Sequence, residues 1–165
     1  MKISIVGGGY VGLVTGTCFA TLGNMVTIIE IDPDKVRAIN KGEPPIYEAD
    51  LEDLLKENVG KNLLAGAGYE SVTSADIVLI AVGTPPKSDG SANLSYIQSA
   101  STSIGQALKD NPSYCVVVVK STVPPGTTET IVRPAVLAAS GKTENEIGFA
   151  MNPEFLREGR AVEDF

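Results

Sequence analysis

The chain has 165 residues, of which 43% are hydrophobic and 5% aromatic, and its formal net charge is −7. This length and apolar content predict one globular domain with an aliphatic core, and they exclude a disordered chain. The acidic balance without a Lys/Arg cluster argues against nucleic acid or an anionic membrane as a partner, and the absence of His excludes His-based acid–base chemistry and most transition-metal sites, so we predict no metal.

Compartment and thiol state follow from two further features. The longest apolar run, 77–82, is too short to cross a bilayer, and Met1 leads directly into an apolar run without room for a signal peptide, so we expect a cytoplasmic protein. Cys18 and Cys115 each fall inside an apolar pattern. We therefore predict buried, reduced thiols rather than a disulfide or a nucleophile.

Residues 2–12 combine a short apolar run with a Gly-x-Gly-x-x-Gly loop and the start of a helical pattern. Gly7 suits a tight turn, Gly9 lets the backbone approach a diphosphate, and Gly12 lets the helix lie close against the strand. The helix would direct its free N–H groups and positive dipole end at the phosphates. Such a match is weak alone, and the alternative is a structural glycine turn. Here the glycine motif lies between a predicted strand and a predicted helix, and Glu30 ends the next strand. This setting predicts a dinucleotide-binding site.

Strands and helices alternate along the rest of the chain. This order predicts an α/β fold, a Rossmann-type doubly wound parallel sheet with helices on both faces. Apolar runs predict strands over 25–31, 76–82, 114–119 and 146–151, with a short one near 63–64; helical periodicity predicts helices over 11–22, 33–41, 50–56, 95–108 and 127–139, before a loop-and-helix segment over 152–165.

Local signals add detail to three of these helices. Asp50 is expected to cap the helix that follows it, and Pro134 is expected to make the 127–139 helix irregular. The first helix is predicted to be amphipathic, with one apolar face made by Val11, Val14, Cys18, Phe19 and Leu22.

In an open α/β sheet, ligands bind outside the carboxyl ends of the strands. Functional residues are therefore sought directly after each strand, where we expect the loops to converge on one crevice. The candidates are 7–12, Glu30 with Lys35, Gly83-Thr84-Pro85, Ser121-Thr122 and 152–158.

Several of these candidates allow two interpretations. Glu30 can accept hydrogen bonds from adenosine ribose hydroxyls, or it can be a strand-end carboxylate paired with Lys35. The hydroxyls of Thr84 and Thr122 can donate to a cofactor or a water, or they can cap local turns.

Glu154 and Glu158 are four positions apart. In a helix both would lie on one face, where like charges repel, so a function in the crevice is plausible and one carboxylate would serve as an acid or base. The alternative is a solvated helical turn in which Arg157 and Arg160 are the partners.

Four motifs together resemble one known family. Residues 7–12, 83–86, 120–124 and 152–159 are similar, in the same order, to the UDP-glucose/GDP-mannose dehydrogenase family, and the Asn-Pro-Glu-Phe-Leu-Arg-Glu-Gly stretch is the most specific of them. The ending 161–165 is closer to the UDP-glucose branch. Members of the family that act on GDP-mannose or UDP-N-acetylmannosamine remain alternatives.

The resemblance implies oxidation of a sugar CH2OH to a carboxylate in two NAD+-dependent steps, with a UDP-sugar as substrate. It implies that Glu154 assists the proton transfers of thioester hydrolysis, that Thr122 helps to hold the water, and that 154–158 line the sugar-nucleotide site. Many members carry Asp where this chain has Glu30. The NAD-contacting set implied is Gly7, Gly9, Tyr10, Val11, Gly12, Glu30, Lys35, Gly83, Thr84, Pro85, Ser121, Thr122 and Glu158, and the sugar-contacting set is Glu154, Phe155, Leu156, Arg157 and Glu158.

The family's nucleophilic Cys lies in a downstream Gly-rich loop that has no counterpart here. We therefore expect residues 1–165 to be the NAD-binding domain of a longer, homo-oligomeric enzyme, without its central helix and C-terminal domain, and to be inactive alone. An NAD-sensing module or a hydroxyacid-type dehydrogenase would also contain the glycine loop, but neither needs the carboxylates of 152–159.

Overall fold

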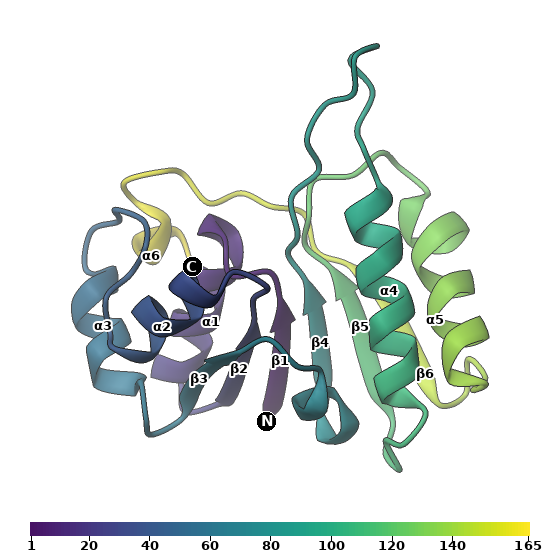
Figure 1. Cartoon of the computed structure of the whole chain (residues 1–165), viewed down its shortest axis with the longest axis horizontal. Coiled ribbons are helices and arrows are strands. Elements are labelled where there is room, and N and C mark those ends of the chain that lie inside the picture. The colour runs from purple at the N-terminus through teal and green to yellow at the C-terminus, as the bar shows by residue number, and fades with distance from the viewer.

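The computed structural model describes all residues, 1–165. Its centre is a sheet of six strands, all parallel, in the order β3-β2-β1-β4-β5-β6 (Figure 1). The chain order reverses between β1 and β4, which makes the crevice above these two strands the topological switch point. The strands are β1 (Lys2–Val6), β2 (Met25–Ile29), β3 (Leu63–Gly66), β4 (Ile77–Ile80), β5 (Cys115–Val119) and β6 (Ile147–Met151).

Helices cover both faces of the sheet, so the predicted fold class is confirmed. The first three helices pack on the β1–β3 half, while α4 and α5 cover the opposite face over β4–β6 (Figure 1). The helices are α1 (Tyr10–Thr21), α2 (Pro33–Asn40), α3 (Leu51–Asn58), α4 (Ser95–Leu108), α5 (Arg133–Ser140) and the short α6 (Ala161–Asp164), with a 3-10 turn η1 (Glu70–Ser74) and a π-helical turn η2 (Thr128–Val132).

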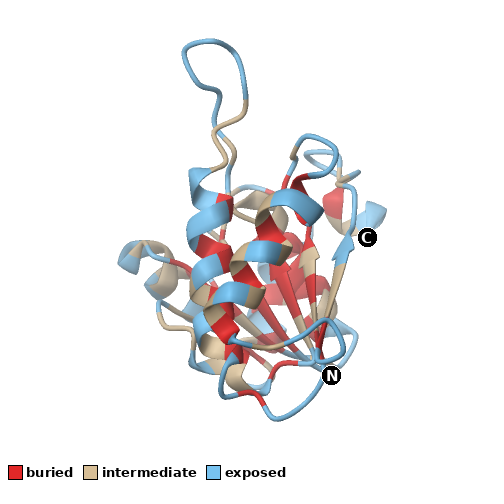
Figure 2. Cartoon of the chain, turned by 90° about the vertical axis from the view of Figure 1, so that its right-hand side faces the viewer, coloured by how far each residue is buried: buried red, intermediate tan, exposed pale blue.

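The core has two layers, one on each face of the sheet. Within β4, Ile77 and Leu79 pack in the layer of α1 and α3, while Val78 and Ile80 pack in the layer of α4 and α5. This alternation is the pleat of a strand buried on both sides. Buried residues therefore concentrate on the strands and on the sheet-facing sides of the helices (Figure 2).

Two local predictions about helices were wrong. α1 is not amphipathic: Thr15 and Thr17 are buried with the apolar residues, and Leu22 is 70% exposed, because α1 lies between the sheet and α3 and is covered on several sides. Asp50 does precede α3, but its side chain makes no capping bond. Its backbone is left-handed, with φ of 62°, whereas a capping residue has an extended backbone.

The predicted irregularity at Pro134 is confirmed. The π-helical turn η2 runs directly into α5, and Pro134, which has no N–H to continue the α-helical hydrogen bonds, stands immediately after this irregular turn. The predicted thiol state is confirmed too. Burial raises the pKa of the Cys18 thiol to about 11, and burial with the nearby Asp76 raises that of Cys115 to about 12. No helix has both the length and the hydropathy needed to cross a bilayer.

Candidate functional site

The glycine loop joins β1 to α1 as predicted. Gly7 has a φ of +110°, and a Cβ there would lie 2.5 Å from the Ala81 carbonyl oxygen; a Cβ on Gly12 would lie 1.9 Å from the carbonyl oxygen of Gly7. A Cβ on Gly9 would meet nothing within 4 Å. Gly9 is the N-cap of α1, and no side chain caps the helix. The first-turn N–H groups therefore face open space, the arrangement that binds an anion such as a diphosphate.

Glu30 lies directly after β2, with 8% of its surface exposed. One carboxylate oxygen accepts from the Gly8 N–H at 3.0 Å, and the other accepts from the Asp32 N–H at 3.0 Å. The structure thus pairs Glu30 with two backbone groups, and the predicted alternative, an ion pair with Lys35, is not formed. Because a carboxylate offers about four lone-pair sites, each oxygen retains capacity for one more donor.

A cleft of about 500 Å³ opens beside this carboxylate, at the carboxyl ends of β1, β2 and β4. Five predicted cofactor residues line it: Gly7, Gly9, Glu30, Lys35 and Gly83. Its size, the open space at Gly9 and the free helix end fit a dinucleotide such as NAD. Sequence reasoning missed the other lining residues, among them Ile31, Tyr69 and Tyr96; the one sequence signal for Ile31 was its position directly after Glu30.

The loops after β4 and β5 are joined to each other. The Thr84 hydroxyl donates to the Thr122 carbonyl oxygen at 2.8 Å, a bond between loops rather than a local turn cap. The Thr122 side chain is exposed, whereas the buried Ser121 hydroxyl lies 2.7 Å from the Val82 carbonyl oxygen. The Ser121 side chain is thus occupied inside the protein. Pro85 is exposed at the base of a hairpin that projects from the domain (Figure 1).

Residues 152–160 are not helical, so Glu154 and Glu158 do not share a helix face. The segment leaves β6 and crosses above the carboxyl ends of the strands toward α1 (Figure 1). Glu154 is held by Lys120, whose Nζ lies 3.1 Å from Glu154 Oε2 and donates to Asn152 Oδ1 at 2.9 Å. Lys120 is 7% exposed, and no separate role was predicted for it.

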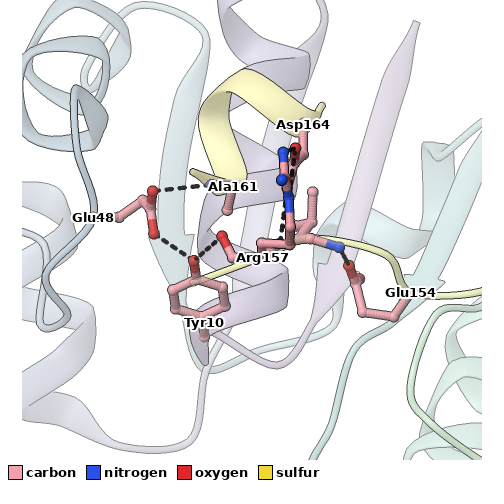
Figure 3. Close-up of polar contacts among 7 residues, drawn as sticks. Tyr10, Glu48, Glu154, Arg157, Ala161 and Asp164 are labelled. Carbon is pink, nitrogen blue, oxygen red and sulfur yellow. Dashed lines mark hydrogen bonds and ion pairs between the residues drawn. The ribbon is translucent and has the colours of Figure 1, made fainter. Parts of the chain in front are cut away.

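The second half of the segment is fixed by an ion pair between Arg157 and Asp164. Arg157 Nε donates to Asp164 Oδ2 at 2.9 Å, so the predicted alternative of arginines paired with Glu154 and Glu158 is wrong (Figure 3). The Arg157 side chain lowers the pKa of Asp164 to about 2. Phe155 and Glu158 are left exposed on the surface.

Tyr10 does not line the cleft; its hydroxyl donates to the carboxylate of Glu48, a residue absent from the sequence predictions (Figure 3). Burial, assisted by this hydrogen bond, raises the pKa of Tyr10 to about 12, and the same bond is the largest cause that holds the pKa of Glu48 below its ordinary value. Of the predicted residues, Val11 follows Tyr10 in the first turn of α1 and does not line the cleft.

Known proteins share this architecture over the whole chain. A model described as "UDP-glucose/GDP-mannose dehydrogenase family, NAD binding domain" matches residues 1–165. The UDP-glucose 6-dehydrogenase AglM of Haloferax volcanii is 42% identical, over 100% of this chain and 39% of its own length.

Two solved structures agree with this match. A ternary complex of GDP-mannose dehydrogenase from Pseudomonas aeruginosa superposes with a TM-score of 0.96 at 38% identity, over 99% of this chain and 38% of its own. A UDP-glucose dehydrogenase from Pyrobaculum islandicum gives a TM-score of 0.91 at 42% identity, over the same shares. The chain thus spans less than two fifths of the length of these relatives.

Proposed function

Since the chain belongs to the UDP-glucose/GDP-mannose dehydrogenase family, as its NAD-binding domain, we propose that it works within an enzyme that oxidises UDP-glucose to UDP-glucuronate. In this proposal residues 1–165 supply the whole NAD site and one wall of the sugar site. The central helix, the second nucleotide-binding domain and the nucleophile belong to the rest of the enzyme.

One observation carries the proposal. The cleft at the switch point joins an uncapped helix end at Gly9 to a buried carboxylate at Glu30, and the 152–160 segment crosses the same edge of the sheet. A cofactor in this cleft and a sugar beneath the segment would therefore meet at the carboxyl ends of the strands.

The residues divide the work in this proposal. NAD+, when bound, would supply the hydride acceptor for both oxidation steps. The α1 N-terminus binds the diphosphate, and the free lone pairs of Glu30 accept from the adenosine ribose hydroxyls. Glu154 moves protons during hydrolysis while Lys120 balances its charge, and the exposed Thr122 hydroxyl holds the water.

The nucleophile of the reaction comes from outside this chain. Burial raises the pKa of both thiols far above neutrality, to about 11 for Cys18 and about 12 for Cys115, so neither forms a thiolate.

GDP-mannose is the second candidate substrate. It is favoured by the TM-score of 0.96 with the GDP-mannose dehydrogenase, whereas the identity of 42% with the UDP-glucose enzymes favours UDP-glucose. A non-catalytic NAD sensor is a weaker alternative, because a sensor does not require a buried Glu154–Lys120 pair on the substrate side.

The test is NADH formation by the longer protein with UDP-glucose, GDP-mannose or UDP-N-acetylmannosamine. We expect UDP-glucose to give the highest kcat/KM, with two NADH formed per sugar, and residues 1–165 alone to give none. A preference for GDP-mannose would replace the substrate assignment, and sustained turnover by residues 1–165 would refute the domain assignment.

A further inference from the structure

Glu48 lies in the loop between α2 and α3, and only 5% of its surface is exposed. Both of its carboxylate oxygens are used by other parts of the chain. Oε2 accepts from the Tyr10 hydroxyl and from the Gly159 N–H at 2.8 Å, and Oε1 accepts from the Ala161 N–H at 2.9 Å. These donors come from the first turn of α1 and from residues 159–161, so the Glu48 side chain joins its own loop to two distant parts of the chain (Figure 3).

The 152–160 segment is held at both ends, by Lys120 at its start and by Glu48 at its end. At its start Glu154 is paired with Lys120, and its other oxygen accepts from the Leu156 N–H at 2.6 Å. At its end Gly159 is bound by Glu48. Between these anchors Phe155 and Glu158 remain exposed, at the place where the proposed function puts the nucleotide sugar.

We propose that Glu48 is a positioning residue for the sugar-nucleotide site, because it fixes the 157–161 backbone to the first turn of the cofactor-binding helix. The identity of that site rests on the proposed function; the anchoring itself rests on the contacts of Glu48. Through Tyr10, the loop that holds the cofactor and the segment that faces the sugar share one hydrogen-bonded group.

The chemistry of the site demands a carboxylate. Three donors converge on Glu48, and they require acceptors on both of its oxygens. Glutamine has nearly the same shape but only one acceptor oxygen, so in Glu48→Gln either Gly159 or Ala161 must face an NH2 group. The Tyr10 hydroxyl can adapt, since it can accept as well as donate.

Amide hydrogen exchange of residues 1–165, followed by NMR, tests this anchoring directly. In Glu48→Gln we expect at least one of the Gly159 and Ala161 amides to exchange at least about tenfold faster, with β1 and β4 unchanged. Glu43→Gln is the matched control, because Glu43 is exposed in the same loop and should leave every amide unchanged. Unchanged exchange at both amides in Glu48→Gln would overturn the proposal.

Two further measurements make the test independent of how well that variant folds. In the wild type the exposed Gly159 should exchange at least about tenfold more slowly than its exposed neighbour Glu158, whose N–H has no partner in the protein. Equal rates would overturn the proposal. Tyr10→Phe leaves both amide acceptors in place, so a loss of protection as large as that in Glu48→Gln would assign the anchoring to Tyr10 instead.

A UDP-glucose titration separates this inference from the proposed function. Weak binding of UDP-glucose should shift the amide resonances of 155–159 in the wild type and in Glu43→Gln. The shifts should be smaller in Glu48→Gln. If the sugar nucleotide shifts nothing in the wild type, the substrate assignment fails, while the exchange rates still decide the role of Glu48.

Discussion

Replacement of Glu30 by alanine should weaken NAD+ binding and reduce discrimination against NADP+. In the structure each Glu30 oxygen already accepts one backbone N–H at 3.0 Å and has a lone pair left for a ribose hydroxyl. NADP+ replaces the 2′ hydroxyl by a phosphate of charge near −2, which removes a donor and brings negative charge against the carboxylate. Lys35, the cation that lines the same cleft, is a flexible point charge and a poor substitute for an arginine fork.

The size of the effect follows from the bonds lost. Hydrogen bonds to a charged group contribute about 1.5–3 kcal/mol each, so two of them set an upper bound of about 3–6 kcal/mol. Water satisfies part of the free carboxylate, and this lowers the net loss. We expect Glu30→Ala to cost about 1.4–3 kcal/mol of NAD+ binding, which is about ten- to 150-fold, and the wild type to prefer NAD+ over NADP+ by more than about tenfold.

Calorimetric titration of both cofactors, at one ionic strength, measures these differences. Glu43→Ala is the control, because it removes the same charge from an exposed position outside the cleft. Equal wild-type affinities for the two cofactors, or an unchanged ratio in Glu30→Ala, would show that Glu30 does not contact the ribose.

Two variants and one pH titration test separate parts of the site. Gly9→Ala should abolish measurable NAD+ binding while it changes the unfolding free energy by less than about 1 kcal/mol, because the added Cβ meets only open space; retained affinity would remove the diphosphate from this loop. Lys120→Met should cost about 3 kcal/mol in chemical denaturation because it leaves the mostly buried Glu154 carboxylate unpaired, and adding Glu154→Gln should recover most of it; no cost for the single variant would refute the pair. Since the pKa of Asp164 is lowered from 3.8 to about 2, its bond to Arg157 should stabilise the segment above pH 3.8 and be lost as the pH falls toward 2. The Arg157 side-chain N–H resonance should follow that titration, and a midpoint at the ordinary carboxyl value would contradict the bridge.

Local patterns were sufficient to predict the sheet and the cofactor loop. Apolar runs mark strands buried on both faces, and the glycine spacing of 7–12 is a local signal, although the clash that excludes a side chain at Gly7 comes from Ala81, far along the chain. Glu30 could be predicted from its position directly after β2. Its carboxylate accepts hydrogen bonds from Gly8 in the glycine loop and from Asp32 two residues on. Such features need only the succession of strand, loop and helix.

The contacts that hold the substrate segment were not readable from local patterns. Glu48 accepts hydrogen bonds from Gly159 and Ala161 at separations of 111 and 113 residues, and nothing in the sequence around position 48 distinguishes it from the exposed Glu43 of the same loop. The shared helix face considered for Glu154 and Glu158 does not form, because tertiary partners, Lys120 for the first and Glu48 for the adjoining Gly159, hold the segment in a non-helical path across the sheet. A spacing of four predicts a shared face only where the backbone is helical.

The most direct test of the whole account is a crystal structure of residues 1–165 with NAD+ bound. We predict the diphosphate over Gly9 at the α1 N-terminus, the adenosine ribose hydroxyls on Glu30, and the nicotinamide end toward Thr122 beneath the 152–160 segment. A cofactor bound elsewhere, or bound in the cleft in the reverse direction with its adenosine at Thr122, would contradict the site proposed for this domain.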